Sequence, residues 1–278
     1  MTLPHGSPIF KTVRAEWFTC LDWLRERSAI LGLADHQQWC QQSDLVNLVM
    51  DVIDWCEHYK VQIITRVDKE FPDFWRHLSD PPHAFFVSGN ANLFLGSHIA
   101  VVGARKATST AMKVGFEIGR YLAACEAIVV SGGAVGCDTA AHLGAMHGSG
   151  TDARTIVVQA GGLAHPYPAA NYSMFRRIVE HGGAIMSERL PMEKAMPWDF
   201  LSRNRLIAGL GMETVVLQAA KKSGAMVTAR HAVEQGKDVY ILKHDPTDVR
   251  AAGSWALIAD GATAFTTSDE YIFGKLTS

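Results

Sequence analysis

From residue 99 onward, short apolar runs alternate with longer segments whose hydrophobic residues follow a helical spacing. The runs are rich in β-branched residues and apolar throughout, which is typical of strands buried on both faces of a parallel sheet. They span residues 99–103, 127–132, 155–160, 184–187, 214–218 and 239–242. Between them, helices are expected at about 109–124, 138–147, 171–181 and 225–235. The alternation predicts an α/β fold with a doubly wound, mostly parallel sheet and right-handed crossovers.

The pattern differs before residue 60. Apolar residues of segment 13–58 recur three and four positions apart, as they do in amphipathic helices that bury one face. These residues are Trp17, Phe18, Leu21, Leu24, Leu45, Leu48, Val49, Val52, Ile53 and Cys56. The sequence therefore predicts a small N-terminal helical region over residues 1–60 and one α/β domain over residues 61–278.

Composition narrows the class of protein. With 278 residues, 48% of them hydrophobic, the chain can bury a sizeable core. A net charge of -2 excludes a protein that coats nucleic acid with its whole surface. No apolar run is long enough for a membrane span, and the first ten residues lack a signal-peptide pattern, so we expect a cytoplasmic protein without membrane contact. Five cysteines without a C-x-x-C pair favour reduced thiols over disulfides or a zinc site.

Positive charge is concentrated in the middle of the chain, where residues 99–230 hold 14 Lys and Arg against 9 Asp and Glu. Such an excess can be an ordinary solvated surface. Here, however, several of the cations follow predicted strands directly. Open α/β sheets bind their ligands at the carboxyl ends of their strands. The charge pattern therefore favours a local anion site at that edge.

Two glycine-containing loops carry the first part of this site. The first has Gly103, Arg105 and Lys106 ahead of hydroxyl residues that can cap the next helix, and a helix N-terminus beside two cations is suited to anions. The second runs from Ser131 through three glycines to Asp138, so that its backbone can approach a ligand closely. Its glycine spacing departs from G-x-G-x-x-G, which argues against a dinucleotide site.

Two later regions complete the candidate site. Asn171 follows a rigid loop containing two glycines and two prolines, which we expect to form a pocket wall. Further on, two arginines flank an asparagine, and two lysines precede a Ser-Gly pair at a predicted helix start that can offer free N–H groups to a phosphate. The candidate phosphate-binding residues are Gly103, Arg105, Lys106, Ser131, Gly132, Gly133, Asn171, Arg203, Asn204, Arg205, Lys221, Lys222, Ser223, Gly224 and Thr228.

A structural role is an alternative for several of these residues. Arg203 and Arg205 can instead pair with Glu188 and Asp199 and hold loops in place. Asn204 can act as a loop anchor.

Three residues of the second loop and the helix after it, Ser131, Asp138 and His142, are of types that also occur in catalytic or metal sites. Asp138 and His142 are four residues apart and can form a proton relay or part of a metal site, but a capping Asp and a pocket-wall His are favoured because no third ligand has suitable spacing. Ser131 lacks the G-x-S-x-G elbow of a nucleophile. We therefore predict no metal, no cofactor and no catalytic residue.

Seven ordered motifs give the chain a resemblance to a known family. They are V-G-x-R at 102–105, S-G-x-A-x-G-x-D-x-x-A-H at 131–142, G-G-L-x-x-x-Y-P at 161–168, S-E at 187–188, R-N-R-x-I-A-G-L at 203–210, S-G-x-x-x-T-A at 223–229 and L-I-x-x-G-A at 257–262. Over roughly residues 60–265 the chain resembles the DNA-processing protein A family, also called DprA or Smf.

The resemblance implies a Rossmann-like domain that binds single-stranded DNA in a basic pocket, protects incoming DNA and helps to load the RecA recombinase during natural transformation. It also implies a homodimer and no catalytic reaction. Arg105 would then make bidentate phosphate contacts, while Asn171 and Asn204 would bond the DNA backbone or a base. Ser131, Gly132, Ser223 and Gly224 would supply backbone or hydroxyl donors.

The chain departs from the family in two places. Lys243-His244-Asp245-Pro246 stands where the family commonly has Pro-Gly, so a different loop shape is expected there. The sequence also ends soon after the last motif, and we expect no C-terminal winged helix. An alternative reading is a phosphoribohydrolase-like enzyme or nucleotide sensor on the same fold, although the P-G-G-x-G-T motif of those enzymes is missing.

Overall fold

The computed structural model describes residues 42–148, 150 and 152–276, so the part of the predicted helical region before residue 42 lies outside the described residues. The first elements, before the main α/β alternation, are α3 (Gln42–Tyr59), β1 (Val61–Thr65), α4 (Asp73–Arg76), β2 (Ala84–Gly89) and η1 (Ala91–Leu95). Helix α3 packs against β1 and β2 through Val49, Ile53 and Cys56. Among the described helices, none is both long and apolar enough to span a membrane.

The α/β alternation follows in the predicted order. Its elements are β3 (His98–Val102), α5 (Ser109–Ala124), β4 (Ile128–Ser131), α6 (Cys137–His147), β5 (Thr155–Val158), η2 (Ala169–Asn171), α7 (Tyr172–Glu180), β6 (Ala184–Ser187), α8 (Asp199–Leu210), β7 (Glu213–Val216), α9 (Gly224–Glu234), β8 (Asp238–Leu242), η3 (Val249–Ala251), α10 (Ala252–Ala259), β9 (Thr263–Phe265) and α11 (Ser268–Leu276). The six predicted strands correspond to β3–β8, within two residues at each end.

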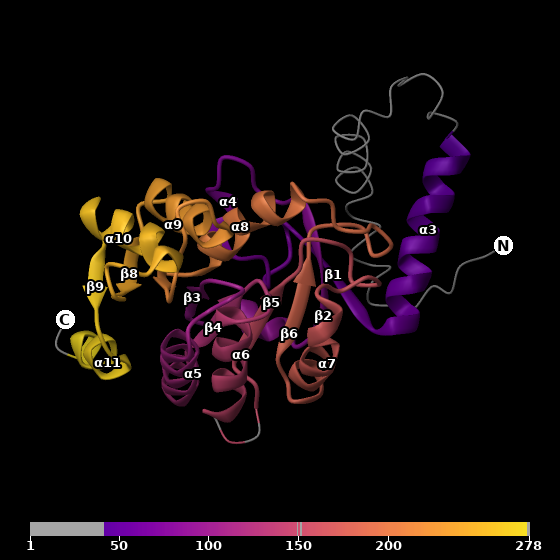
Figure 1. The fold of residues 1–278 in the computed structure, drawn as a ribbon. Helices are drawn as coiled ribbons and strands as arrows, with labels where there is room; N and C mark the ends of the chain where they lie inside the picture. Colours follow the sequence, from indigo (N-terminus) through magenta and orange to yellow (C-terminus); the bar gives the residue numbers. More distant parts are fainter. Residues whose placement is uncertain (1–41, 149, 151, 277–278) are drawn as a thin grey trace.

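The described strands form one sheet in the order β1-β2-β6-β5-β4-β3-β7-β8-β9 (Figure 1). Every neighbouring pair from β6 to β9 is parallel, whereas β1 pairs with β2 and β2 pairs with β6 in antiparallel register. The predicted doubly wound, mostly parallel α/β fold is therefore confirmed. Strands β1, β2 and β9 were not predicted, because their short apolar runs lie outside the regular alternation of strands and helices in the sequence.

Helices cover both faces of the sheet, as the fully apolar strands require. Val101, Val129 and Val215 point to the face covered by α5, α6 and α11, while α7 packs beside them on Val157 and Ile185. Alternate residues of the same strands point to the other face, which is covered by α4, α8, α9 and α10. Figure 1 shows α5, α6 and α7 below the sheet and α4, α8 and α9 above it.

The strand order reverses between β3 and β7. From β3 the chain adds β4, β5 and β6 on one side, then returns to place β7, β8 and β9 on the other. The loops that leave β3 and β7 consequently diverge to opposite faces. At such a switch point the carboxyl edge of the sheet opens into a crevice, which is where doubly wound proteins bind ligands.

Candidate nucleic-acid interface

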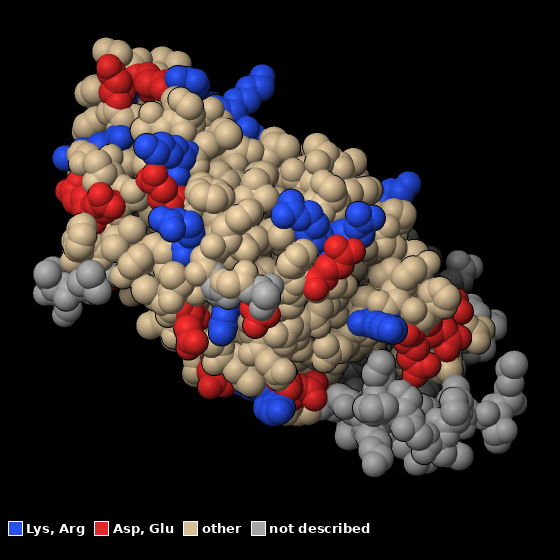
Figure 2. Space-filling view, turned by 90° about the horizontal axis from the view of Figure 1, so that it is seen from below, with Lys and Arg blue, Asp and Glu red and all other residues tan. Residues whose placement is uncertain are grey.

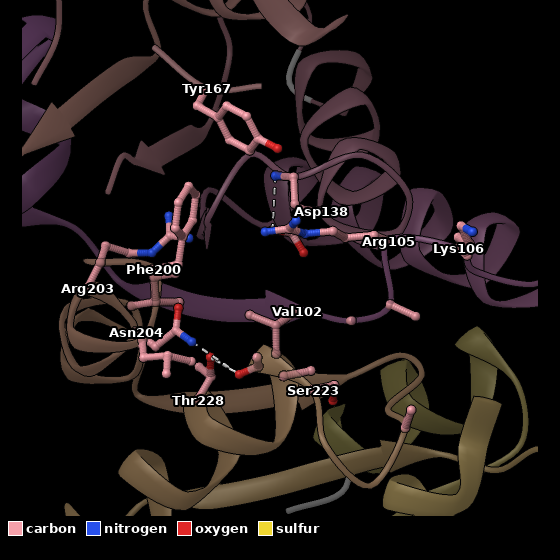
Figure 3. Close-up of a pocket in the computed structure, with 18 of the residues that line it drawn as sticks. Val102, Arg105, Lys106, Asp138, Tyr167, Phe200, Arg203, Asn204, Ser223 and Thr228 are labelled. Atoms are coloured by element: carbon pink, nitrogen blue, oxygen red, sulfur yellow. Dashed lines mark hydrogen bonds between the residues drawn. The ribbon is translucent and has the colours of Figure 1, made fainter. Parts of the chain in front are cut away.

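A cavity of about 720 Å³ opens at the carboxyl ends of β3 and β7 (Figure 3). Three segments form most of its wall: the loop after β3, the first half of α8, and the loop that joins β7 to α9. Its lining residues include Val102, Gly103, Ala104, Arg105, Lys106, Asp138, Tyr167, Phe200, Arg203, Asn204, Ser223, Gly224, Thr228 and Arg250. The cavity thus lies at the switch point of the sheet and gathers eight of the fifteen candidate residues.

Arg105 and Lys106 are the exposed cations of the first loop. Thr108 fixes this loop where it enters α5: its hydroxyl caps α5 by accepting the Ala111 N–H at 3.1 Å, and its own N–H donates to Oε1 of Gln218 at 2.9 Å. Since Gln218 follows β7, the bond ties the two diverging loops together. The backbone that carries Arg105 is therefore held in place, while its side chain is free to meet a ligand.

An aromatic surface faces Arg105 across the cavity. The guanidinium carbon of Arg105 lies 5.6 Å from the ring centroid of Phe200, within the range of a cation–π contact. The Phe200 ring packs edge-on against Tyr167, with centroids 5.3 Å apart and an angle of 72° between the planes. Tyr167 is 47% exposed. This wall offers ring surface to an unstacked base beside a cation suited to phosphate.

The floor of the cavity is the start of α9. Nδ2 of Asn204 and Oγ1 of Thr228 both donate to the Gly224 carbonyl, at 3.1 and 3.2 Å. Ser223, at the N-cap, makes no side-chain capping bond, and its buried hydroxyl has no partner among the described residues. The first-turn N–H groups of α9 are thus presented at the positive end of the helix dipole. Asn204 has the anchoring role considered as an alternative, and it also lines the cavity.

Arg203 reaches the cavity from behind and is buried. Its Nη1 donates to the carbonyl of Gly132 at 3.1 Å and to that of Val158. Burial lowers the pKa of Arg203 to about 10, although nearby Asp138 works in the opposite direction. A Cβ at Gly132 would lie 2.7 Å from the guanidinium, so a larger residue there would displace the Arg203 side chain. Arg203 therefore satisfies the hydrogen-bonding capacity of two strand-end carbonyls and supports the glycine loop.

Asp138 and His142 are also parts of this support. Oδ2 of Asp138 accepts the Ala134 N–H at 3.2 Å, and burial raises the pKa of its carboxyl group. The Thr155 hydroxyl donates to the Val129 carbonyl, which leaves it to accept the Nδ1 proton of His142 at 2.7 Å. Burial lowers the pKa of His142 to about 3, so the imidazole is neutral. Both residues have structural roles, but not the expected ones: Asp138 lines the cavity and braces the preceding loop instead of capping α6, whose N-cap is Gly136, and His142 is buried and does not line the cavity.

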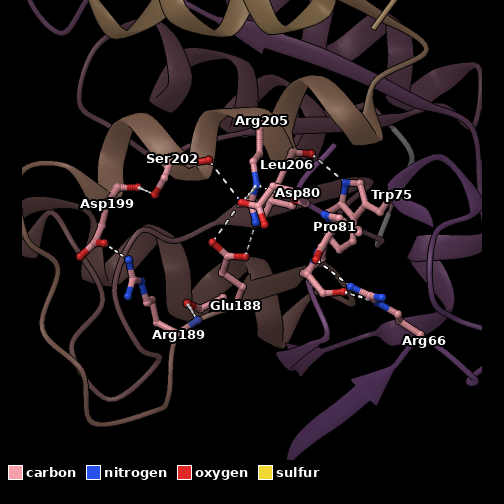
Figure 4. Close-up of polar contacts among 12 residues, drawn as sticks. Arg66, Trp75, Asp80, Pro81, Glu188, Arg189, Asp199, Ser202, Arg205 and Leu206 are labelled. Carbon is pink, nitrogen blue, oxygen red and sulfur yellow. Dashed lines mark hydrogen bonds and ion pairs between the residues drawn. The ribbon is translucent and has the colours of Figure 1, made fainter. Parts of the chain in front are cut away.

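Arg205 lies on a different side of α8, outside the residues that line the cavity (Figure 4). Its Nη1 and Nη2 donate to the two carboxylate oxygens of Glu188 at 3.0 and 2.7 Å, and its Nε lies 3.1 Å from Oδ2 of Asp80. The alternative in which Arg205 pairs with Glu188 is therefore what the structure contains. The companion pairing of Arg203 with Asp199 is wrong, because Asp199 pairs with Arg189.

The remaining candidates surround the cavity without lining it. Ser131 and Asn171 are buried behind the glycine loop, where Nδ2 of Asn171 donates to the Gly133 carbonyl at 2.8 Å and to the Thr139 hydroxyl at 2.9 Å. Gly132 and Gly133 belong to the same loop. Lys221 and Lys222 are exposed directly before Ser223, at the outer edge. Their charges lie near the entrance of the cavity and not in its wall.

Three cavity residues with an aromatic or charged side chain were not among the candidates: Tyr167, Phe200 and Arg250. Tyr167 stands inside the motif at 161–168 and Phe200 shortly before the motif at 203–210, but aromatic residues there predict core packing equally well. Arg250 follows the loop that departs from the family pattern, so no motif pointed to it.

The described residues on the side of α5, α6 and α7 carry charges of both signs. Viewed from the side of α5, α6 and α7, Lys and Arg are interspersed with Asp and Glu (Figure 2). Arg176 and Glu180 of α7, for example, form an exposed ion pair at 3.3 Å.

Comparisons with known proteins agree with this geometry. The family model described as DNA recombination-mediator protein A matches residues 62–274. The DNA processing protein DprA of Bacillus subtilis is 34% identical over 209 residues, which cover 75% of this chain and 69% of that protein. The protein of the same name from Streptococcus pneumoniae is 32% identical over 219 residues, covering 78% and 75%.

Two solved structures are similar as well. The X-ray structure of DprA from Streptococcus pneumoniae superposes with a TM-score of 0.70 at 31% identity, covering 77% of this chain and 74% of that one. DNA processing protein A from Helicobacter pylori, described for its single-stranded DNA binding mode, also gives a TM-score of 0.70, at 28% identity and with coverage of 79% and 97%. These matches do not favour the phosphoribohydrolase alternative. The chain belongs to the DNA recombination-mediator protein A family.

Proposed function

We propose that the cavity at the switch point binds single-stranded DNA. The observation that carries the proposal is the placement of the Arg105 guanidinium over Phe200 beside the open N-terminus of α9. Single-stranded DNA can contact both parts of this site. Its phosphates are accessible to the guanidinium and the helix N-terminus, and its bases can unstack and pack on the ring. The single-stranded DNA binding described for the Helicobacter pylori relative supports the same conclusion.

The proposed contacts divide between backbone and base. Arg105 and Lys106, with the first-turn amides of α9, hold phosphates, and Lys221 and Lys222 add charge at the entrance. Phe200 and Tyr167 receive a base. Arg203, Asn204 and Asn171 act from behind by fixing the loops, while Arg205 has no part in binding. A duplex keeps its bases stacked inside, so it gains only the phosphate contacts.

The test is the affinity of a fluorescein-labelled oligothymidylate, measured by anisotropy over a range of salt concentrations. Arg105→Ala is expected to weaken binding by about tenfold or more, because a charged hydrogen-bond donor is lost. It should also lower the salt dependence by about 0.7 per phosphate contact removed. Arg176→Ala on α7 is the matched control, since it removes the same charge elsewhere. Equal affinities of the two variants would refute the proposed site.

From family membership we further infer that the protein acts as a binder and not as an enzyme, that it works as a homodimer, and that it delivers the strand to a RecA-type recombinase. Recovery of the oligonucleotide unaltered after binding tests the first inference. Sedimentation analysis tests the second. Faster assembly of recombinase filaments on strands coated with a single-strand binding protein tests the third, with Arg105→Ala expected to abolish the gain.

A further inference from the structure

Arg250 brings a third guanidinium to the cavity from a segment that no motif marks. It lies in η3 and lines the cavity together with Arg105, Lys106, Ala220 and Ser223. Its side chain is 54% exposed. Because η3 follows β8, the residue approaches from the β8 end of the sheet, next to the loop that joins β7 to α9. A strand held at Arg105 and the start of α9 would pass within reach of it.

The Arg250 side chain is paired with an acid from its own turn. Its Nε donates to Oδ1 of Asp248 at 2.9 Å and its Nη2 donates to Oδ2 at 2.8 Å. The Asp248 carboxylate also accepts the Arg250 backbone N–H at 2.9 Å, which caps η3. These hydrogen bonds from Arg250 lower the pKa of Asp248, so the acid is ionised at neutral pH. The pair therefore presents little net charge to an approaching phosphate.

A phosphate can displace such an acid. The pairing is bidentate, and a phosphate group offers a guanidinium the same two-oxygen geometry. The Arg250 side chain is 54% exposed and that of Asp248 17%, so water reaches the guanidinium and screens the pair. A screened ion pair contributes little free energy, so exchanging one anionic partner for another costs little. Asp248 keeps its second function after the exchange, because its bond to the backbone N–H does not involve the guanidinium.

We propose that Arg250 is a phosphate-binding residue of this pocket and that Asp248 restrains it. When a strand binds, one of its phosphates replaces the Asp248 carboxylate as the partner of the Arg250 guanidinium. This inference rests on the proposed single-stranded DNA site. It makes Asp248 a residue that limits affinity: the acid competes with the strand for one of the cations at the cavity.

The decisive variant is Asp248→Asn, which removes the negative charge and keeps a side-chain oxygen to cap η3. We expect it to bind oligothymidylate about two- to fivefold more tightly at low salt, the range set by an exposed ion pair. The salt dependence should become steeper by up to about 0.7, because one more phosphate is neutralised without a competing acid. Arg250→Ala should bind about threefold or more weakly than the wild type.

Glu180→Gln on α7 is the matched control, because it frees Arg176 from an exposed ion pair and changes the net charge by the same amount. In the Arg250→Ala background, Asp248→Asn should add no more than Glu180→Gln adds. Asp248→Ser, which also caps helices, repeats the test if the asparagine lowers the melting temperature.

Two results would overturn the inference: an Asp248→Asn affinity no higher than that of Glu180→Gln, or an Arg250→Ala affinity equal to that of the wild type. Arg105→Ala is measured in parallel. If Arg105→Ala loses binding while Arg250 and Asp248 have no effect, only the present inference fails. If Arg105→Ala binds normally, the proposed function itself fails.

Discussion

The guanidinium of Arg105 and the ring of Phe200 face each other at 5.6 Å, one from the loop after β3 and the other from the first turn of α8. The loop leads into α5 on one face of the sheet, whereas α8 covers the other face, and the contact exists only because both meet at the carboxyl edge of the sheet. The cation is placed to bind the phosphate of a nucleotide, and the ring is placed to stack on its base. The ring contribution and the cation contribution can therefore be separated by substitution.

Replacing Phe200 tests the ring. Phe200→Leu keeps an apolar side chain but removes the aromatic face, and base stacking is worth about 1–3 kcal/mol per base, so oligothymidylate should bind at least about fivefold more weakly. Phe200→Tyr should retain the wild-type affinity. Phe273→Leu, a change of an exposed ring on α11, serves as the control. Equal affinities of the leucine and tyrosine variants at position 200 would show that base stacking on this ring does not contribute to binding.

Arg205 is expected to matter for stability and not for DNA. Its side chain and that of Glu188 are only 13% and 9% exposed, so Arg205→Met removes a guanidinium from a nearly buried carboxylate. Breaking such a pair costs about 3 kcal/mol or more in the free energy of unfolding, which urea denaturation would measure. The double variant Arg205→Met, Glu188→Met should recover part of the loss. A stable Arg205→Met protein with impaired DNA binding would contradict this assignment.

The stability of the protein should fall in mild acid because of buried histidines. Nε2 of His98 donates to the Leu93 carbonyl at 2.8 Å, and burial lowers the pKa of His98 from 6.5 to about 4. Between these two pH values the unfolded chain binds the proton and the folded protein does not. The free energy of unfolding therefore decreases as pH falls from 6.5 to 4, by up to about 1.4 kcal/mol per pH unit for this group.

His142 acts in the same direction down to about pH 3, whereas Asp138, whose pKa is raised by burial, opposes it above the ordinary carboxyl pKa. The contribution of His98 is isolated by His98→Gln, which keeps a hydrogen-bond donor that does not titrate. Its urea-derived stability should depend less steeply on pH between 6.5 and 4. A slope identical to that of the wild type would mean that His98 is protonated in the folded protein.

Gly136 is predicted to be essential for the shape of the Arg105 loop. Its φ is 89°, and a Cβ there would lie 2.6 Å from the Arg105 carbonyl oxygen. Gly136→Ala should lower the free energy of unfolding by about 1–3 kcal/mol through backbone strain, and more through the collision, and it should weaken DNA binding. Gly182→Ala is the control, because Gly182 has a φ of 81° but no described atom within 4 Å of its Cβ position. That variant should be destabilised with unchanged DNA affinity.

The helical period explains one error in the sequence analysis. Arg203 and Arg205 were grouped as neighbouring cations, yet residues two apart on a helix point in different directions. The structure places one guanidinium beneath Gly132 and the other against Glu188. A helix over residues 199–210, which was not among the predicted helices, separates them. No comparable signal was available for Tyr167, because a half-exposed aromatic residue and a buried one look alike in sequence.

The alternation of strands and helices, the glycine loops and the position of Arg105 and Lys106 at a strand end can all be predicted along the chain, since they follow from local periodicity and from short-range backbone requirements. Which charges remain available to a ligand cannot be predicted in this way. Arg203 and Arg205 are paired with carbonyls and carboxylates distant in the chain, while Arg250 is brought to the cavity from a loop without a motif. The availability of a charge depends on the partners that folding places around it, and those partners come from elements far apart in the sequence.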